Sequence, residues 1–146
     1  MEPEIPQNTG SIARLCAATG IPLHLVGRLG FSLDSAALRR AGLDYWEQVC
    51  VGVHRDFESF LEVVRGRPLR LYTRRGKRLY TEVEHTSRDV LVYGSESAGL
   101  PEGLVSEHAE HTVRVPVREG VRSLNLAAVV HLTAYHALYR MGFPGL

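Results

Sequence analysis

The feature that most constrains this chain is a long apolar helix that directly follows a β-branched run and a short polar loop. Apolar residues recur at three- and four-residue intervals from Leu126 to Met141, which is the spacing of one helical face. Gly142, with Pro144 just beyond it, is an ordinary helix stop. The β-branched run at residues 113–117 predicts a strand before the loop.

The rest of the circumference of this helix is also largely apolar. It carries Val129, Leu132, Tyr135 and Tyr139. A helix that is apolar nearly all round needs cover on two sides, so we expect one face to pack on a sheet and the other on a second copy of the chain. Ser123 or Asn125 can cap the first turn, and capping with core packing would explain the helix taken by itself.

A second element, at residues 90–101, is a predicted buried strand that runs into a glycine-punctuated loop. Val90 to Tyr93 form the strand, and Gly94 and Gly99 allow backbone conformations or close approaches that a side chain would block. Ligands of open α/β sheets lie beyond the carboxyl ends of the strands, which would place a site here. Taken alone, the glycines indicate a turn at least as readily.

Together the two elements are more specific. The loop reads G-x-E-x-x-G-L-P from Gly94 to Pro101, and V-P-V at residues 115–117 is followed by R-S-L-N-L at 122–126. This pair resembles the two C-terminal motifs of SPOUT-class RNA methyltransferases. Residues 2–20 and 39–47 resemble the branch of that class that methylates the ribose 2′-oxygen of the tRNA wobble nucleotide, position 34, a cytidine or a modified uridine. The resemblance extends in order from Glu2 to Gly145.

Composition agrees with one globular domain at residues 1–146. Apolar content of 45% and charged content of 23% are ordinary, and the length suits a single core. No apolar run reaches the roughly 18 residues of a membrane span, and no secretory signal pattern opens the chain, so we expect a cytoplasmic protein with no membrane partner. Cys16 and Cys50 form no C-x-x-C pair, and we expect both to be buried apolar fillers.

The net charge of +1 gives weak guidance about partners, but basic residues are clustered. The main cluster consists of Arg65, Arg67, Arg70, Arg74, Arg75, Lys77 and Arg78, and a second consists of Arg39 and Arg40. They suit phosphate contacts, although a solvated face is an equally good explanation of the charges taken alone.

Local patterns predict alternating strands and helices, and hence an α/β fold with a largely parallel sheet and helices on both faces. The predicted strands are residues 23–26, 49–53, 69–73, 90–93 and 113–117. The predicted helices are residues 11–19, capped by Asn8 or Thr9 and ended by Gly20, then a helix that starts at Ser32 or Asp34 and runs through Leu38, 56–64 capped by Asp56, 102–108 and 126–141.

The resemblance adds two features of the fold. It implies a C-terminal trefoil knot whose loops bind the cofactor, although most chains avoid threading. It also implies a first strand immediately before residues 2–6, where this chain has only Met1. Either the start was assigned too late or the domain is compromised, and the intact motifs favour the first explanation.

The resemblance also implies S-adenosylmethionine as the methyl donor, without a metal. Three loops are then expected to form the donor pocket. Its residues would be Tyr72, Thr73, Gly94, Glu96, Gly99, Val115, Pro116, Ser123 and Leu124. Backbone groups of Gly94, Val115 and Leu124 are suited to recognising the edge of the adenine ring, because backbone groups add no side-chain bulk.

Arg14, in N-T-G-S-I-A-R, matches the arginine that acts on the 2′-hydroxyl in related ribose methyltransferases. A guanidinium keeps its proton to a pKa above about 12, so it suits orientation of the hydroxyl, stabilisation of oxyanion charge or a phosphate contact better than general-base catalysis. In isolation, Arg14 would be an ordinary surface arginine. Further candidates are Ser123 and Asn125 in catalysis, and Asn8, Arg122 and Tyr135 for binding the tRNA.

Some positions depart from the family pattern or offer other chemistry. Ala98 stands where relatives often have arginine, and Ala127 where they often have serine. His108 and His111, interleaved with glutamates, are one conceivable metal site, but such hydrophilic runs are usually solvated.

Three functions remain open at this point. The first is a homodimeric tRNA ribose 2′-O-methyltransferase, and the second is a catalytically silent RNA-binding module of the same fold. A nucleotide-binding enzyme of ordinary doubly wound topology is disfavoured, because no G-x-G-x-x-G follows the first strand and no P-loop occurs. Donor binding distinguishes the first from the second.

Overall fold

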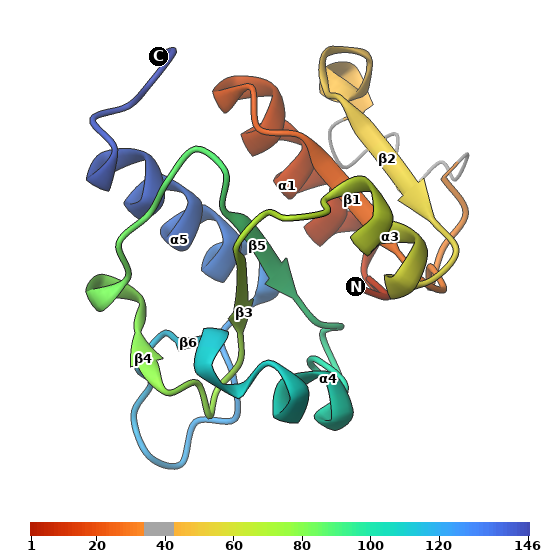
Figure 1. Ribbon diagram of the computed structural model, residues 1–146. Coiled ribbons are helices and arrows are strands. Elements are labelled where there is room, and N and C mark those ends of the chain that lie inside the picture. Colours follow the sequence, from red (N-terminus) through yellow and green to blue (C-terminus); the bar gives the residue numbers. More distant parts are fainter. Residues whose placement is uncertain (34–42) are drawn as a thin grey trace. The chain divides into compact units, whose positions relative to one another are not determined.

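The computed structural model describes residues 1–33 and 43–146, and it shows alternating helices and parallel strands (Figure 1). The chain divides into two compact units. One comprises Met1–Arg65 with Gly145–Leu146, and the other comprises Gly66–Pro144. The predicted α/β class with parallel pairing is confirmed. Residues 34–38 of the helix predicted to run through Leu38 lie outside the described residues.

The first unit begins with α1, Pro6–Thr19, which starts five residues earlier than predicted. The prediction that Asn8 or Thr9 caps it was wrong, because both are buried inside the helix and Ile5 occupies the cap position without a side-chain bond. Pro6 explains the early start: its ring presets the helical φ, and it has no N–H that needs a cap. Gly20 ends the helix in the left-handed region, at φ 69°.

Two parallel strands follow α1 in this unit, β1 (Leu23–Val26) and β2 (Val51–His54). The backbone N–H of Glu2 donates to the carbonyl of Val26 at 2.7 Å, so the extended amino-terminal segment runs to the end of β1. A 3₁₀ helix, η1 (Leu43–Gln48), precedes β2. After β2 comes α3 (Phe57–Val63).

Two local predictions for this unit had different outcomes. Asp56 caps α3 as predicted, because its carboxylate accepts from the N–H of Ser59 at 2.8 Å in a reciprocal capping box. The cysteines differ from each other: Cys16 is buried, and burial raises the pKa of its thiol to about 11, whereas Cys50 is exposed. The expectation that Cys50 is a buried filler was wrong, since it stands at the surface just before β2.

The second unit contains a four-stranded parallel sheet in the order β4, β6, β3, β5. Its strands are β3 (Leu69–Tyr72), β4 (Arg78–Leu79), β5 (Val90–Tyr93) and β6 (Thr112–Arg114). The sequence did not predict β4, which has only two residues. The strand predicted at residues 113–117 stops at Arg114, because Pro116 has no N–H to give to a ladder.

Helices of the second unit are short except for the last one. They are η2 (Tyr80–Glu82), α4 (Glu102–Glu107), η3 (Ala109–His111) and α5 (Leu126–Arg140). Asn125 caps α5, as one of the two predicted candidates, by accepting from the N–H of Ala128 at 3.2 Å. The buried face of α5 has the predicted helical spacing and comprises Ala127, Val130, Thr133, Ala134, Ala137 and Leu138.

The core of this unit lies where α5 meets the sheet. Tyr72 of β3 stacks on Tyr93 of β5, with ring centroids 4.9 Å apart and an interplanar angle of 14°. Val83 and Val113, each 1% exposed, pack against them. The hydroxyl of Thr133 on α5 donates to a carbonyl within its own helix, so the Tyr93 hydroxyl donates to it, at 2.6 Å. The strands and the helix are therefore fixed to each other by packing and by a buried polar contact.

A buried carboxylate lies at the opposite end of the same strands. Asp89, with a side chain 4% exposed, precedes β5 and accepts from Arg70 of β3 at 2.8 Å, from the Thr86 hydroxyl at 2.9 Å and from Nδ1 of His85 at 3.0 Å. Burial acts to raise the pKa of Asp89, but these bonds outweigh it and hold the pKa below its usual range. Burial lowers the pKa of His85, so the ring is neutral near pH 7 and its bond to Asp89 is not an ion pair.

We expect Arg70→Met to destabilise the protein strongly, because it leaves the Asp89 carboxylate buried without its cation. Breaking such a pair from one side costs about 3 kcal/mol of unfolding free energy, which urea denaturation would measure. Arg88→Met is the matched control, since the exposed Arg88 guanidinium donates to the carbonyl of Gly66 and should contribute much less. Equal losses in the two variants would show that Asp89 does not depend on Arg70.

Candidate active site

The candidate site lies at the carboxyl edge of the four-stranded sheet. Tyr72 pairs in register with Tyr93 on one side and with Val113 on the other, so β3, β5 and β6 end almost level. The loops that leave this edge are residues 73–77, 94–101 and 115–125. All the predicted donor-pocket residues lie on these loops except Tyr72, which is the last residue of β3.

The loop after β5 folds back on itself immediately. Ser95 and Gly99 exchange two backbone hydrogen bonds, of 3.2 and 3.0 Å, and the Ser95 hydroxyl accepts from the N–H of Ala98 at 3.2 Å. Gly99 has φ 73°, in the region that favours glycine. A Cβ on Gly94 would lie 1.9 Å from the carbonyl carbon of Gly99, so only glycine fits there.

The loop after β3 lies against β6 in a similar way. The N–H of Thr73 donates to the carbonyl of Val113 at 2.9 Å, and that of Lys77 donates to the Thr112 hydroxyl at 3.0 Å. A Cβ on Gly76 would lie 2.3 Å from the carbonyl carbon of Val113. Nothing in the sequence predicts this contact beyond a glycine that follows two arginines.

The third loop is open to solvent. Arg122, Ser123 and Leu124 are exposed, with Leu124 44% exposed although it is apolar. An exposed leucine beside a glycine-lined edge suits contact with a ligand that has an apolar face. Asn125 ends the loop and caps α5, so its side-chain oxygen already accepts a hydrogen bond from the helix.

Several predicted site residues differ in how accessible their side chains are. Tyr72 is 7% exposed in the core, and burial raises the pKa of its phenol, so its side chain is not an acid–base group near neutral pH. Asn8 is 6% exposed within α1, which leaves little of it for a substrate. Tyr135 is 45% exposed on the outer face of α5.

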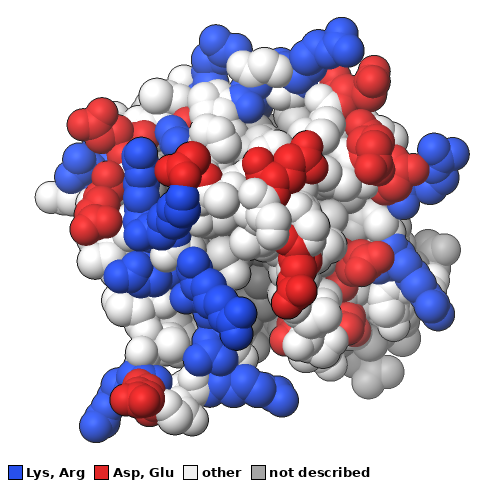
Figure 2. Space-filling view, turned by 60° about the horizontal axis from the view of Figure 1, so that its bottom comes forward, with Lys and Arg blue, Asp and Glu red and all other residues white. Residues whose placement is uncertain are grey.

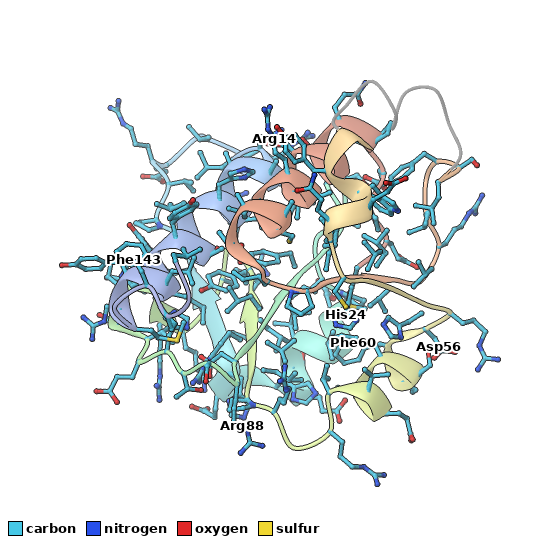
Figure 3. The ribbon with its side chains drawn as sticks, turned by 90° about the horizontal axis from the view of Figure 1, so that it is seen from above. Arg14, His24, Asp56, Phe60, Arg88 and Phe143 are labelled. Atoms are coloured by element: carbon cyan, nitrogen blue, oxygen red, sulfur yellow. The ribbon has the colours of Figure 1, made fainter. Side chains whose placement is uncertain are left out.

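Arg14, the predicted catalytic residue, is exposed on α1 in the first unit (Figure 3). Its Nη2 donates to the hydroxyl of Tyr45 in η1 at 3.2 Å, and its Cζ lies 4.9 Å from the centroid of the Tyr45 ring. Tyr45 lies within residues 39–47, which carry part of the family resemblance, but its 31-residue separation from Arg14 left no local signal of this contact.

The conceivable histidine site is not a metal cluster. His108 and His111 have ring centroids 6.4 Å apart, and Glu110 is engaged by Lys77. Across residues 1–33 and 43–146, no three His, Cys, Asp or Glu side chains are placed to hold one ion. In the same ranges, no helix has the length and apolar character to cross a membrane.

Comparison with known proteins shows a class of enzyme that this site fits. The family model described as SpoU rRNA Methylase family matches residues 1–135, and the chain belongs to this family. The resemblance noted in the sequence is thereby confirmed.

Three relatives illustrate the match. The tRNA (cytidine(34)-2'-O)-methyltransferase of Burkholderia pseudomallei strain 1106a is 45% identical over 148 residues, covering 99% of this chain and 95% of the relative. A solved structure concerned with 2-OH methylation of C/U34 on tRNA superposes with a TM-score of 0.91 at 44% identity, covering 97% of this chain and 92% of that one. An AdoMet-bound rRNA methyltransferase from Sinorhizobium meliloti gives a TM-score of 0.81 at 26% identity, covering 93% of this chain and 52% of that one.

We expect Gly94→Ala to disrupt the edge loop, since the added methyl group would overlap the Gly99 backbone. Overpacking of this kind costs about 2–3 kcal/mol of unfolding free energy. Binding of S-adenosylmethionine, measured by calorimetry, should fall at least about tenfold, because a displacement of 1 Å at a site can cost more than that.

The matched control for this variant is Gly103→Ala, in α4. No atom lies within 4 Å of a Cβ built on Gly103, and alanine should stabilise the helix by about 0.5–1 kcal/mol without affecting donor binding. Unchanged donor affinity in Gly94→Ala would contradict the assignment of this loop to the donor site.

Proposed function

We propose that this chain transfers a methyl group from S-adenosylmethionine to the ribose 2′-hydroxyl of the wobble nucleotide of tRNA, position 34, a cytidine or a modified uridine. The observation that carries the proposal is the level carboxyl edge of the sheet with its Gly94–Gly99 closure. The activity named for the Burkholderia pseudomallei relative, 45% identical over 99% of this chain, supports the reaction and the substrate. A silent RNA-binding module is not favoured by these comparisons.

The edge loops fit the donor. Gly94 and Gly76 are buried where any Cβ would collide with a neighbouring chain segment, so these glycines let the edge loops pack closely around a site that main-chain groups can line. We assign the donor to the backbone of Gly94, Val115 and Leu124, with Thr73 and Ser123 supplying short polar side chains. Bound there, S-adenosylmethionine supplies an electrophilic methyl group. The remaining predicted donor contacts, from Glu96, Gly99 and Pro116, belong to the same loops.

Arg14 is proposed to act on the 2′-hydroxyl. A guanidinium remains protonated at neutral pH, so it can orient the hydroxyl and stabilise negative charge on its oxygen as the proton leaves. We also propose catalytic roles for Ser123 and Asn125 at the end of the third edge loop, where Asn125 caps the start of α5. Contact of Asn8 and Tyr135 with the tRNA remains a prediction from the sequence.

Basic residues near the donor edge suit the tRNA phosphates. Arg74, Arg75, Arg118 and Arg122 are exposed on the loops after β3 and β6, and Figure 2 shows Lys and Arg side chains gathered on one side of this face. Two members of the cluster read from sequence are already engaged: Arg70 pairs with Asp89, and Lys77 pairs with Glu110. We therefore propose that the exposed arginines, among them Arg122, contact the tRNA phosphates.

The test is transfer of labelled methyl to tRNA that lacks wobble 2′-O-methylation, followed by nucleoside mapping. Label is expected on the wobble ribose, and the KM for tRNA should rise with salt, because phosphate contacts release counterions. Label at another nucleotide would overturn the substrate assignment. RNA binding without donor binding or transfer would favour the silent module instead.

In the same assay, Arg14→Ala should abolish transfer while donor binding survives. Arg55→Ala is the control, because the side chain of Arg55 is 88% exposed in the same unit and pairs with Asp56. Loss of donor binding along with transfer would show that Arg14 is structural rather than catalytic.

We also propose a homodimer that covers the outer face of α5. Leu132, Tyr135 and Tyr139 are 42%, 45% and 67% exposed on this helix, and Phe143 just beyond is 41% exposed. Sedimentation at micromolar concentration should give one species of twice the 16.2 kDa chain mass, and Tyr139→Asp should shift it to the monomer. A monomeric wild-type protein would refute this proposal.

Family membership and the proposed substrate support four further proposals. Since the family model spans both units, we propose that they form one methyltransferase domain over residues 1–146. We propose helices on both faces of its sheet and a trefoil knot through the loop before α5, which a chain trace in a crystal structure would test. The tRNA substrate supports a cytoplasmic location, which cell fractionation would test.

A further inference from the structure

Arg14 and Tyr45 form a contact that joins two segments of the first unit. Arg14 lies on α1 and Tyr45 on η1. The phenol of Tyr45 contacts the guanidinium of Arg14 in two ways. Its oxygen accepts a hydrogen bond from Nη2 at 3.2 Å, and the centroid of its ring lies 4.9 Å from Cζ. A hydrogen bond and a cation–π contact from the same side chain restrict the guanidinium at two points.

The partner of the Arg14 guanidinium is a phenol and not a carboxylate. Arg14 takes part in none of the salt bridges among residues 1–33 and 43–146, and no carboxylate accepts from it there. Arg70 and Arg55, in contrast, are each paired with an aspartate. The neutral phenol therefore holds Arg14 without neutralising it, and the full positive charge remains for a negative or developing negative oxygen.

A restraint of this kind has a physical use for an exposed arginine. The side chain has several rotatable bonds, and fixing them at the moment of reaction costs conformational entropy. A guanidinium that is already held by Tyr45 loses less freedom when it meets the 2′-hydroxyl, which is how preorganisation lowers a barrier.

We propose that Tyr45 is a positioning residue for Arg14, holding its guanidinium in the orientation that methyl transfer requires. This inference rests on the proposed function for its kinetic consequence, although the restraint itself can be measured without any activity. Tyr45 acts through Arg14 and is not assigned a contact with the donor.

The kinetic test compares Tyr45→Phe with the wild type. Phenylalanine keeps the ring under the guanidinium and removes the hydrogen bond, so we expect kcat to fall about tenfold with donor affinity unchanged. Trp46→Phe is the control for general loosening of η1, since Trp46 is a half-buried aromatic of the same element, and its kcat should stay within about twofold. Equal kcat in Tyr45→Phe and the wild type would overturn the proposal.

A double-mutant cycle then separates positioning from a structural role. Lysine cannot reproduce the planar stack, so in an Arg14→Lys background, Tyr45→Phe should change kcat by less than about twofold. A loss of the same size in both backgrounds would show that Tyr45 acts independently of Arg14.

A spectroscopic measurement keeps this proposal distinct from the proposed function. Nitrogen-15 relaxation of the Arg14 guanidinium should show restricted motion in the wild type and faster motion in Tyr45→Phe. Failure of the wild type to methylate tRNA would refute the function and leave this readout intact. Equal mobility in the two proteins would refute the restraint even if methyl transfer were confirmed.

Discussion

The buried carboxylate of Asp89 is the interaction on which much of the second unit depends. A carboxylate that is 4% exposed is tolerated only when its oxygens are hydrogen-bonded and its charge is balanced. Arg70 provides the cation from β3, while His85 and Thr86 donate from the segment before β5. The two carboxylate oxygens of Asp89 thus link the starts of the neighbouring strands β3 and β5. This link fixes the register in which the remaining residues of the two strands pair.

At the other end of the strands, the same register brings glycines to the edge. Tyr72 and Tyr93 are register partners at the ends of β3 and β5 and stack on each other, so the chain leaves these two strands side by side. Gly94 and Gly76 are the positions where this closeness excludes a side chain. The donor site we propose is therefore made mostly of backbone, and the stability of the core beneath it determines its shape.

The sequence predicted those parts of the fold that depend on local chemistry. Asp56 and Asn125 cap their helices as expected, and β1 and β5 have the predicted bounds, because capping and β-branched runs act over a few residues. The start of α1 was misplaced because the polar Asn8 and Thr9 look like caps, whereas Pro6 decides where the helix begins.

Contacts between distant segments could not be predicted from local patterns. The two-residue strand β4 exists only because β6 lies beside it, and nothing in residues 78 and 79 alone indicates a strand. The partner of Arg14 is 31 residues away, and the pairing of Arg70 with a buried aspartate was hidden among surface arginines. The proposed donor loops could be located in the sequence because their glycine spacing is characteristic of a family. The close contact that requires glycine at position 94 is visible only in the three-dimensional structure.

The Ser95–Gly99 bridge also bears on how this loop can vary among relatives. Its two backbone bonds fix the number of residues between the strand and Leu100, which is 7% exposed, so an insertion would break the closure. Ala98 is exposed beside the bridge, so its side chain can change without altering the path of the chain. We therefore expect divergence at this loop to occur by substitution at constant length.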